Sequence, residues 1–302
     1  METTYAEPLP LLLLGRQVRD VVKSFPNCRF SLRAGKNSFH TYADHIGFFR
    51  FMGGRRGREP GEAWGSNRYI PIESFDIGEI QAAAKGGAVG EIMDAEASRL
   101  AIVLSQQDSG ALFDVIQYTI REIIRNSAEH SRGTQISLMA QYWPAKGLAE
   151  IVITDDGVGI PYNIYENEYV ECSTAREALK FALLPGVSGV SRQERAQQDE
   201  FWGNSGFGLY VTSRLCSENG GFRIISADQG LTLVGATQVE HDWSFRGTCV
   251  QLRLNVRDAI AMKDAIPRLV EEGETKRASL ISRYPIQASA ASKMLASQYR
   301  KL

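Results

Sequence analysis

A long amphipathic helix followed directly by two strands of alternating polarity is the feature that most restricts how this chain can fold. Between residues 110 and 131, apolar side chains recur at helical spacing and share one face: Phe113, Ile116, Ile120 and Ile123. Residues 135–143 then alternate between apolar and polar, and residues 150–154 do so again after a short loop at 144–148. A helix beside an antiparallel hairpin predicts an α+β fold, with helices on one face of a mainly antiparallel sheet, rather than a βαβ repeat.

Further elements extend this pattern on both sides of the hairpin. A helix is expected at 88–107 before it and another at 209–218 after it. Three short strands are expected near the end of this region, at 222–226, 232–236 and 248–254. The segment 161–202 is polar and irregular apart from a helical stretch at 174–184. A connection of that length inside a compact domain is usually a functional lid.

The first 85 residues are expected to form a small α/β module of their own. Helical patterns at 18–24 and 38–52 flank a predicted strand at 28–32. A loop rich in glycine, arginine and proline at 53–67 then precedes a short strand at 69–72. The pattern therefore alternates helix and strand without the regular spacing of the hairpin region.

Two glycines and two prolines suggest how the chain divides. Gly86 and Gly87 separate the N-terminal module from the domain at 86–255. Residues 256–302 look helical, with Pro267 and Pro285 as interruptions. The predicted organisation is therefore a module at 1–85, a domain at 86–255 that carries the lid, and a helical C-terminal extension.

The composition is that of a soluble globular protein. Of the 302 residues, 43% are hydrophobic and 23% are charged, and the net charge is −1. This balance gives no general attraction to nucleic acid or to anionic membranes, so neither is an expected partner. The leucine-rich run at 9–14 is too short to span a membrane, and Glu7 with no basic region before it argues against a signal peptide.

The cysteines and a basic loop have plain interpretations. The four cysteines are widely scattered and form no CxxC pair, which favours reduced packing thiols in a cytoplasmic protein. Four arginines lie in or beside the loop at 53–67: Arg50, Arg55, Arg56 and Arg58. They could bind phosphates, but Glu59 and Glu62 dilute them and no aromatic residues are regularly interleaved, so a solvated loop is the better interpretation.

Three polar segments carry the functional signal, and the first lies on the long helix. Glu122, Asn126 and His130 are spaced four residues apart, which places them on one stripe beside the apolar face. The side-chain oxygen of Asn is a hard ligand that suits a hydrated divalent cation, and a Glu can orient or deprotonate a water. A plain polar helix face is the alternative, and this segment alone favours that alternative.

The second segment follows the strand at 150–154. Asp155 lies at the end of a strand that should be buried, ahead of Asp156, Gly157 and Gly159. A buried carboxylate requires a hydrogen-bond donor, and the exocyclic amine of a purine can supply one. The glycines allow close approach of the backbone to a ligand and positive φ angles. The alternative is a simple turn after a strand.

The third segment precedes the helix at 209–218. Gly203, Gly206 and Gly208 would leave backbone N–H groups at a helix N-terminus, where they can bind phosphate oxygens. The alternative is a flexible loop before a helix. The segment is not a P-loop, because the chain contains no GxxxxGK[ST], and it is not a dinucleotide fingerprint, because it follows the lid rather than a strand.

In this order the three segments resemble the N, G1 and G2 boxes of the histidine-kinase-like ATPases, the GHKL or Bergerat-fold group. This group includes sensor histidine kinases, anti-sigma serine kinases, DNA gyrase, mismatch-repair ATPases and heat-shock chaperones. The resemblance covers roughly residues 86–255, and Gly220-Gly221 and Gly247-Thr248 match two further family features. It implies a two-layer α/β sandwich with ATP and Mg²⁺ as cofactors.

The resemblance also implies roles for single residues. Glu122 would activate the nucleophile, Asn126 would bind Mg²⁺, and Asp155 would accept a hydrogen bond from the adenine amine. Further contacts to ATP are expected from His130, Gly157, Gly159, Ile160, Gly203, Ser205, Gly206, Phe207, Gly208, Leu209 and Thr248. Asp156 and Asn204 stand where the family most often has Asn and Gly, so the metal coordination and the lid geometry could differ from the family pattern.

Two branches of the group are not expected. His40 and His45 lack the sequence context of a phosphoacceptor histidine, which argues against a classical histidine autokinase. The residues after Asn255 are too few for the transducer domain of the gyrase and chaperone branch. A stand-alone ATPase domain remains, and the N-terminal module loosely resembles part of a STAS-like domain, which accompanies anti-sigma-type ATPases.

Two functional hypotheses follow. In the first, the chain is an Mg²⁺-dependent ATPase or serine/threonine-type protein kinase in a bacterial-type regulatory or defence system, and it acts on a regulatory protein partner. In the second, it is a nucleotide-gated switch with little turnover, in which ATP orders the lid at 161–202 and changes a partner surface. A homodimer formed through the C-terminal helices is an open possibility in both.

Overall fold

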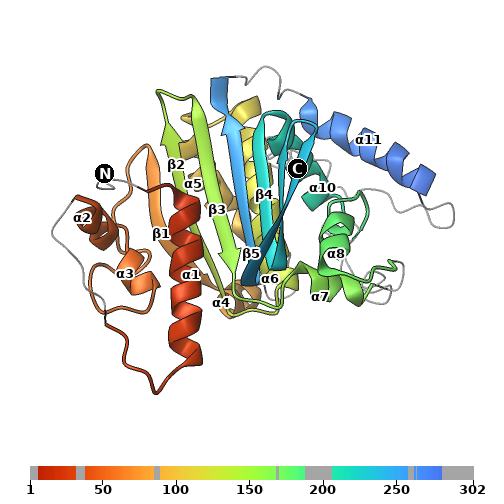
Figure 1. Cartoon of the computed structure of the whole chain (residues 1–302). Helices are drawn as coiled ribbons and strands as arrows, with labels where there is room; N and C mark the ends of the chain where they lie inside the picture. Colours follow the sequence, from red (N-terminus) through yellow and green to blue (C-terminus); the bar gives the residue numbers. More distant parts are fainter. Residues whose placement is uncertain are drawn as a thin grey trace.

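Five antiparallel strands form one sheet in the part of the chain that the computed structural model describes, which comprises residues 6–31, 38–84, 89–167, 170–187, 206–257, 262 and 264–280. Their order across the sheet is β1-β2-β3-β5-β4 (Figure 1). The strands are β1 (Tyr69–Asp76), β2 (Gln135–Trp143), β3 (Leu148–Asp155), β4 (Gly220–Val234) and β5 (Thr237–Asn255). The α+β class and the antiparallel sheet are therefore confirmed.

Helices lie on both faces of this sheet (Figure 1). Before β2 the chain forms α1 (Pro8–Ser24), α2 (Ser38–His45), α3 (Phe48–Phe51), α4 (Ile77–Ala84), α5 (Val89–Ser105) and α6 (Ala111–His130). After β3 it forms α7 (Ile160–Tyr165), α8 (Ala175–Ala182), α10 (Gly208–Glu218) and α11 (Ala265–Leu280).

The alternation along each strand divides the side chains between two cores. In β2, Leu138 packs into the larger core under α5 and α6, while its neighbour Met139 packs into the smaller core on the opposite face. In β3, Ile153 and Val152 divide in the same way. Leu138 lies directly opposite Ile153 in the register of the two strands, so both strands present the same face to the helices.

The larger core joins the sheet to α5, α6, α10 and α11. Leu100 of α5, Ile120 of α6 and Leu215 of α10 are all 0% exposed within it. Full burial of an aliphatic side chain of this size stabilises a fold by about 1.5–3 kcal/mol. The C-terminal half of α6 is consequently held rigidly against the sheet, and this half carries the first polar segment.

The smaller core is built by the N-terminal part of the chain. Leu12 of α1 is 0% exposed and packs with Met139, Val152 and Ile225 on the second face of the sheet. Figure 1 shows α1 lying across this face, with α5 and α6 behind the sheet. Strand β1 pairs with β2 and forms one edge of the sheet. Residues before 86 thus supply both an edge strand and a covering helix.

Several elements differ from the sequence prediction. Residues 28–31 form a bend and irregular structure rather than a strand, and the helix expected at 38–52 is divided at Gly47 into α2 and α3. Helix α1 begins at Pro8, ten residues earlier than expected, because the leucine-rich run is helical and packs on the sheet. Helix α4 was not expected.

The C-terminal part of the sheet also differs. Two long strands, β4 and β5, replace three short ones, and they are joined by a two-residue turn, since Val234 pairs with Thr237. Pro267 is the third residue of α11 and does not interrupt it, because the N–H groups of the first helical turn have no intrahelical partner to lose. Pro285 lies outside the described residues.

Candidate functional site

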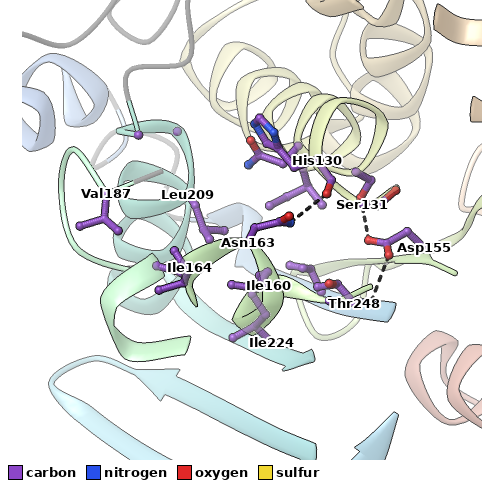
Figure 2. Close-up of a pocket in the computed structure, with 18 residues that line it drawn as sticks. His130, Ser131, Asp155, Ile160, Asn163, Ile164, Val187, Leu209, Ile224 and Thr248 are labelled. Atoms are coloured by element: carbon purple, nitrogen blue, oxygen red, sulfur yellow. Dashed lines mark hydrogen bonds between the residues drawn. The ribbon is translucent and has the colours of Figure 1, made fainter. Parts of the chain in front are cut away.

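A cavity lies where the end of α6 meets the end of β3, helix α7 and the start of α10 (Figure 2). It encloses about 740 Å³ of empty space, its open mouth included. Ile224 and Val250 of the sheet line its apolar side, and Asp155 lies at its polar end.

Asp155 is the last residue of β3 and is 3% exposed. Its Oδ1 accepts hydrogen bonds from the backbone N–H of Gly157 at 3.0 Å and of Thr248 at 3.2 Å. Its Oδ2 accepts one from the hydroxyl of Ser127 at 3.3 Å (Figure 2). Burial raises the pKa of Asp155 to about 6, although the three hydrogen bonds oppose the shift. The two backbone N–H groups both bind Oδ1, whereas Oδ2 is bound by Ser127, which also lines the cavity.

The adjacent Asp156 is not part of the cavity lining and has a different task. Its Oδ1 accepts from the N–H of Thr134 at 2.6 Å and of Gln135 at 2.8 Å, and its Oδ2 accepts from the Thr134 hydroxyl at 2.8 Å. Burial alone would raise the pKa of Asp156, but these hydrogen bonds outweigh it and lower the pKa. Asp156 therefore anchors the start of β2.

Two glycines are required where the backbone crowds Asp155. Gly247 has φ +90°, and a Cβ there would lie 2.2 Å from the carbonyl oxygen of Asp155. Gly159 has φ +85°, and a Cβ there would lie 2.9 Å from the hydroxyl of Ser226. Both positions combine a left-handed backbone with close contact, so only glycine fits without displacement.

Ser226 ties these two glycine turns together, and its role was not predicted. Its hydroxyl accepts a hydrogen bond from the N–H of Ile160 at 2.8 Å and lies 3.0 Å from the carbonyl oxygen of Gly247, to which it donates. It also lies 3.1 Å from the hydroxyl of Thr248. One buried side chain on β4 thus connects the start of α7 with the loop before Thr248.

Helix α6 forms one wall of the cavity. Asn126, Ser127 and His130 line it, as the four-residue spacing predicts for the first and the last of them. Glu122, one turn earlier, does not line it. The Glu122 side chain is 0% exposed and lies 3.0 Å from the guanidinium of Arg125 and 3.6 Å from that of Arg121.

Helices α7 and α8 cover the cavity from the lid side. Asn163 of α7 donates from Nδ2 to the carbonyl oxygen of His130 at 2.8 Å, which closes α7 onto the end of α6 (Figure 2). Ile164 of α7 and Ala182 of α8 belong to a small separate core and also line the cavity. The described part of the lid is therefore a packed unit in contact with the site.

Comparison with known protein families agrees with this arrangement. Residues 113–258 match the family described as histidine kinase-, DNA gyrase B- and HSP90-like ATPase. This part of the chain is therefore similar to the ATPase domain of this family. The predicted GHKL resemblance is thereby confirmed, and it supports ATP binding and an ATPase-type function in general. The STAS-like character of the N-terminal segment stays a prediction.

A second comparison and the length of the helices give two further facts about the chain. A search of curated proteins found no match. In the described part of the chain, no helix has the length and apolar character needed to cross a membrane.

The ATPase domain brings together most of the residues that its motifs predict. Those that line the cavity are Asn126, His130, Asp155, Gly159, Ile160, Gly206, Gly208, Leu209 and Thr248. Glu122, Gly157 and Phe207 do not line it, and Phe207 is 0% exposed in the larger core. Gly203 and Ser205 lie outside the described residues, as do residues 188–202 of the predicted lid.

The same domain contains lining residues that sequence reasoning missed. Ser127 and Asn163 both face the cavity and hydrogen-bond to Asp155 and His130 respectively. Ser127 could have been noticed because it directly follows Asn126, whereas Asn163 and Ser226 lie in segments without any motif.

A magnesium ion held jointly with nucleotide phosphates is compatible with these side chains. No group of three or more His, Cys, Asp or Glu gathers anywhere in the described ranges, so an all-protein metal cage is absent there. Mg²⁺ commonly takes only one or two protein oxygens and completes its shell with phosphates and water. Asn126 lines the cavity and can supply one such oxygen.

Proposed function

We propose that this chain binds Mg²⁺-ATP and either hydrolyses it or transfers its γ-phosphate to a serine or threonine of a regulatory protein. The proposed setting is a cytoplasmic regulatory or defence system of bacterial type. The buried carboxylate of Asp155, oriented by two backbone N–H groups at the polar end of an apolar cavity, is the observation that carries this proposal.

The base would bind at the Asp155 end. Because Oδ1 is occupied by Gly157 and Thr248, Oδ2 is the oxygen placed to accept from an exocyclic amine. The apolar side chains of Ile224 and Val250 offer contacts for the faces and edge of a purine. A base with a carbonyl at that position would face a carboxylate without a shared proton, which favours adenine over guanine.

The phosphates would lie toward α10 and Asn126. Gly208 begins α10, an 11-residue helix whose first N–H groups and dipole favour negative charge. Asn126 would ligate Mg²⁺, and the bound ion would neutralise the phosphate charge. In hydrolysis, Glu122 would accept a proton from the attacking water, whose oxygen forms the new bond to the γ-phosphorus while the bond to the β–γ bridging oxygen breaks, giving ADP and phosphate.

A nucleotide-gated switch with little turnover is the second candidate. The buried position of Glu122 favours it, because the carboxylate does not line the cavity. Under this alternative, ATP would order the lid and change a partner surface without rapid hydrolysis. A regulatory protein, or a second copy of the chain, would then bind the surface that the ordered lid presents.

Calorimetry with Mg²⁺-ATP tests the shared core of both candidates. Wild type should bind, Asp155→Asn should not, and the exposed control Asp228→Asn should bind as wild type does. Equal binding by wild type and Asp155→Asn would refute the proposed base site.

Turnover then separates the two candidates. Phosphate release or phosphotransfer that disappears in Glu122→Gln, with binding retained, supports the enzyme. Binding without turnover, together with ATP-dependent protection of residues 161–202 from proteolysis, supports the switch.

A further inference from the structure

The side chain of Glu122 is held away from the site that it is proposed to serve. It is 0% exposed, and neither of its carboxylate oxygens has a hydrogen-bond partner in the described part of the chain. Ion pairs hold it instead, because Arg125 Nη2 lies 3.0 Å from Oε2 and Arg121 Nη2 lies 3.6 Å from Oε1. These two cations offset part of the cost of burying the carboxylate in this position.

Arg121 and Arg125 do not contribute equally to the ion pairing of Glu122. Arg121 also lies 3.7 Å from Asp94 of α5 and stacks near Tyr118, with 5.5 Å between its guanidinium and the ring centre. It therefore joins α6 to α5. Arg125 makes the shorter contact with Glu122 and is the principal counter-ion of that carboxylate.

Gly208 is in close contact with Glu122 and also lines the cavity. A Cβ at Gly208 would lie 1.9 Å from Glu122 Oε2, so the carboxylate presses against the backbone where α10 begins. Gly208 itself lines the cavity, whereas Glu122 does not. The start of α10 is joined to the lid, because Gly186 donates its N–H to the carbonyl oxygen of Gly206 at 3.0 Å. The described end of the lid is therefore hydrogen-bonded to the segment that leads into Gly208.

Arg125 has a second carboxylate within reach. Its Nε lies 3.8 Å from Oε2 of Glu129, one helical turn further along α6. The guanidinium is shared between a fully buried carboxylate on one side and a partly exposed carboxylate on the other. If Glu122 turned toward the cavity, Arg125 would keep a partner in Glu129.

We propose that Arg125 is a positioning residue that holds Glu122 in a resting orientation behind Gly208, and that turnover requires Glu122 to leave Arg125. The inference rests on the proposed role of Glu122 as the group that activates the nucleophile. Weakening the contact between Arg125 and Glu122 raises turnover, and strengthening it lowers turnover, while the base end of the cavity at Asp155 is unaffected.

Substitutions at Arg125 and Glu129 test whether turnover rises when the contact between Arg125 and Glu122 is weakened and falls when it is strengthened. Arg125→Met keeps the length of the side chain but removes its charge, and we expect kcat to rise about tenfold, which corresponds to a difference of ~1.4 kcal/mol. Arg125→Lys keeps the charge and should stay near the wild-type rate. Glu129→Gln removes the competing carboxylate, and we expect kcat to fall about twofold, the scale of a partly exposed helical ion pair.

Controls separate this effect from general disturbance. Arg16→Met is the matched control, because Arg16 is also buried and is paired with Asp20 of its own helix, on the opposite face of the sheet. It should change kcat little. The double variant Arg125→Met/Glu122→Gln should be inactive, since the gain requires the carboxylate. For every variant, Mg²⁺-ATP affinity is measured by calorimetry and folding by thermal melting.

The outcomes are distinguishable. Faster turnover in Arg125→Met with unchanged ATP affinity supports the proposal, and so does slower turnover in Glu129→Gln. Equal or slower turnover in a folded Arg125→Met overturns it. If Arg125→Met does not fold, an unchanged or raised kcat in Glu129→Gln overturns it instead. ATP binding without turnover in wild type and in every variant refutes this inference together with the enzyme candidate and leaves the switch candidate standing, whereas absence of ATP binding in wild type refutes the proposed function as a whole.

Discussion

The two neighbouring aspartates of the ATPase domain should respond to the same substitution in opposite directions. The folded protein raises the pKa of Asp155 from 3.8 to about 6, because burial disfavours the charged carboxylate. A group whose pKa is higher in the folded state than in the unfolded state stabilises the fold below its unfolded pKa. That stability is lost as the pH rises through the folded pKa. At pH 7 the ionised Asp155 therefore destabilises the protein without ligand.

The size of the pKa shift of Asp155 sets how much its charge destabilises the fold. A shift from 3.8 to about 6 lowers the free energy of unfolding by at most about 3 kcal/mol at pH 7. Asn at position 155 keeps an oxygen for the N–H groups of Gly157 and Thr248, and its amide can donate to the Ser127 hydroxyl. Allowing for burial of the new amide, we expect Asp155→Asn to stabilise the fold by ~1–2 kcal/mol and to raise Tm by a few degrees.

The paired variant is Asp156→Asn. The pKa of Asp156 is lowered, since three hydrogen bonds from Thr134 and Gln135 favour its ionised form. Its contribution is present above the unfolded pKa and is lost as the pH falls through the lower, folded pKa. Asp156→Asn should therefore lower Tm at pH 7.

Thermal melts at pH 7 without nucleotide, followed by calorimetry with Mg²⁺-ATP, provide the assay. Asp155→Asn should be more stable and should not bind, whereas folded Asp156→Asn should be less stable and should still bind. A lower Tm for Asp155→Asn than for wild type would refute the reasoning, because it would mean that the carboxylate stabilises the empty site.

Three further predictions concern the same end of the cavity. Because the adenine amine requires an ionised Asp155, affinity for adenosine, which carries no phosphate, should fall about tenfold between pH 7.5 and pH 5; a flat pH profile would contradict a pKa near 6. Gly247→Ala should lower stability by ~2–4 kcal/mol, since it adds backbone strain to a collision with Asp155. Gly61→Ala, at the same φ of +90° but with nothing within 4 Å of the added Cβ, should show the strain alone, and equal losses in the two melts would mean that the collision is relieved. Ser226→Ala should cost ~1–3 kcal/mol and weaken nucleotide binding, because Ile160 N–H and Gly247 C=O lose their partner; unchanged affinity by calorimetry would show that Ser226 serves the fold alone.

Local pattern predicted the elements whose neighbours in space are also neighbours in the chain. Strand β2 and helix α6 have the expected bounds to within a residue, because period-two and helical spacing run through them without interruption. In the long hairpin of β4 and β5, register shifts near Ser226 and Ala227 interrupt the alternation, and the sequence pattern therefore breaks into shorter strands. The described part of the strand predicted at 28–32, residues 28–31, has no partner strand in the described sheet.

The residues of the site also fall into two groups, those that lie in short sequence motifs and those held by contacts between distant segments. Asp155, Asn126 and Thr248 were found because each lies in a short motif. Ser226 was missed because its contact to Ile160 spans 66 residues. The hydrogen bond from Asn163 to His130 spans 33 residues. Contacts of this kind leave no periodic signal, since nothing near these residues in the chain reports the partner.

The sequence by itself determined the order of α6, β2 and β3, the α+β class and the resemblance to the GHKL ATPases, because these follow from local spacing and from short motifs. The tertiary structure alone decided that α1 covers the second face of the sheet and that Glu122 lies behind Gly208 beside Arg125. It also decided that two consecutive aspartates have pKa values shifted in opposite directions. The physical reason is that burial and hydrogen-bond partners set the energy of a charged side chain, and both are supplied by distant segments that only the fold brings together.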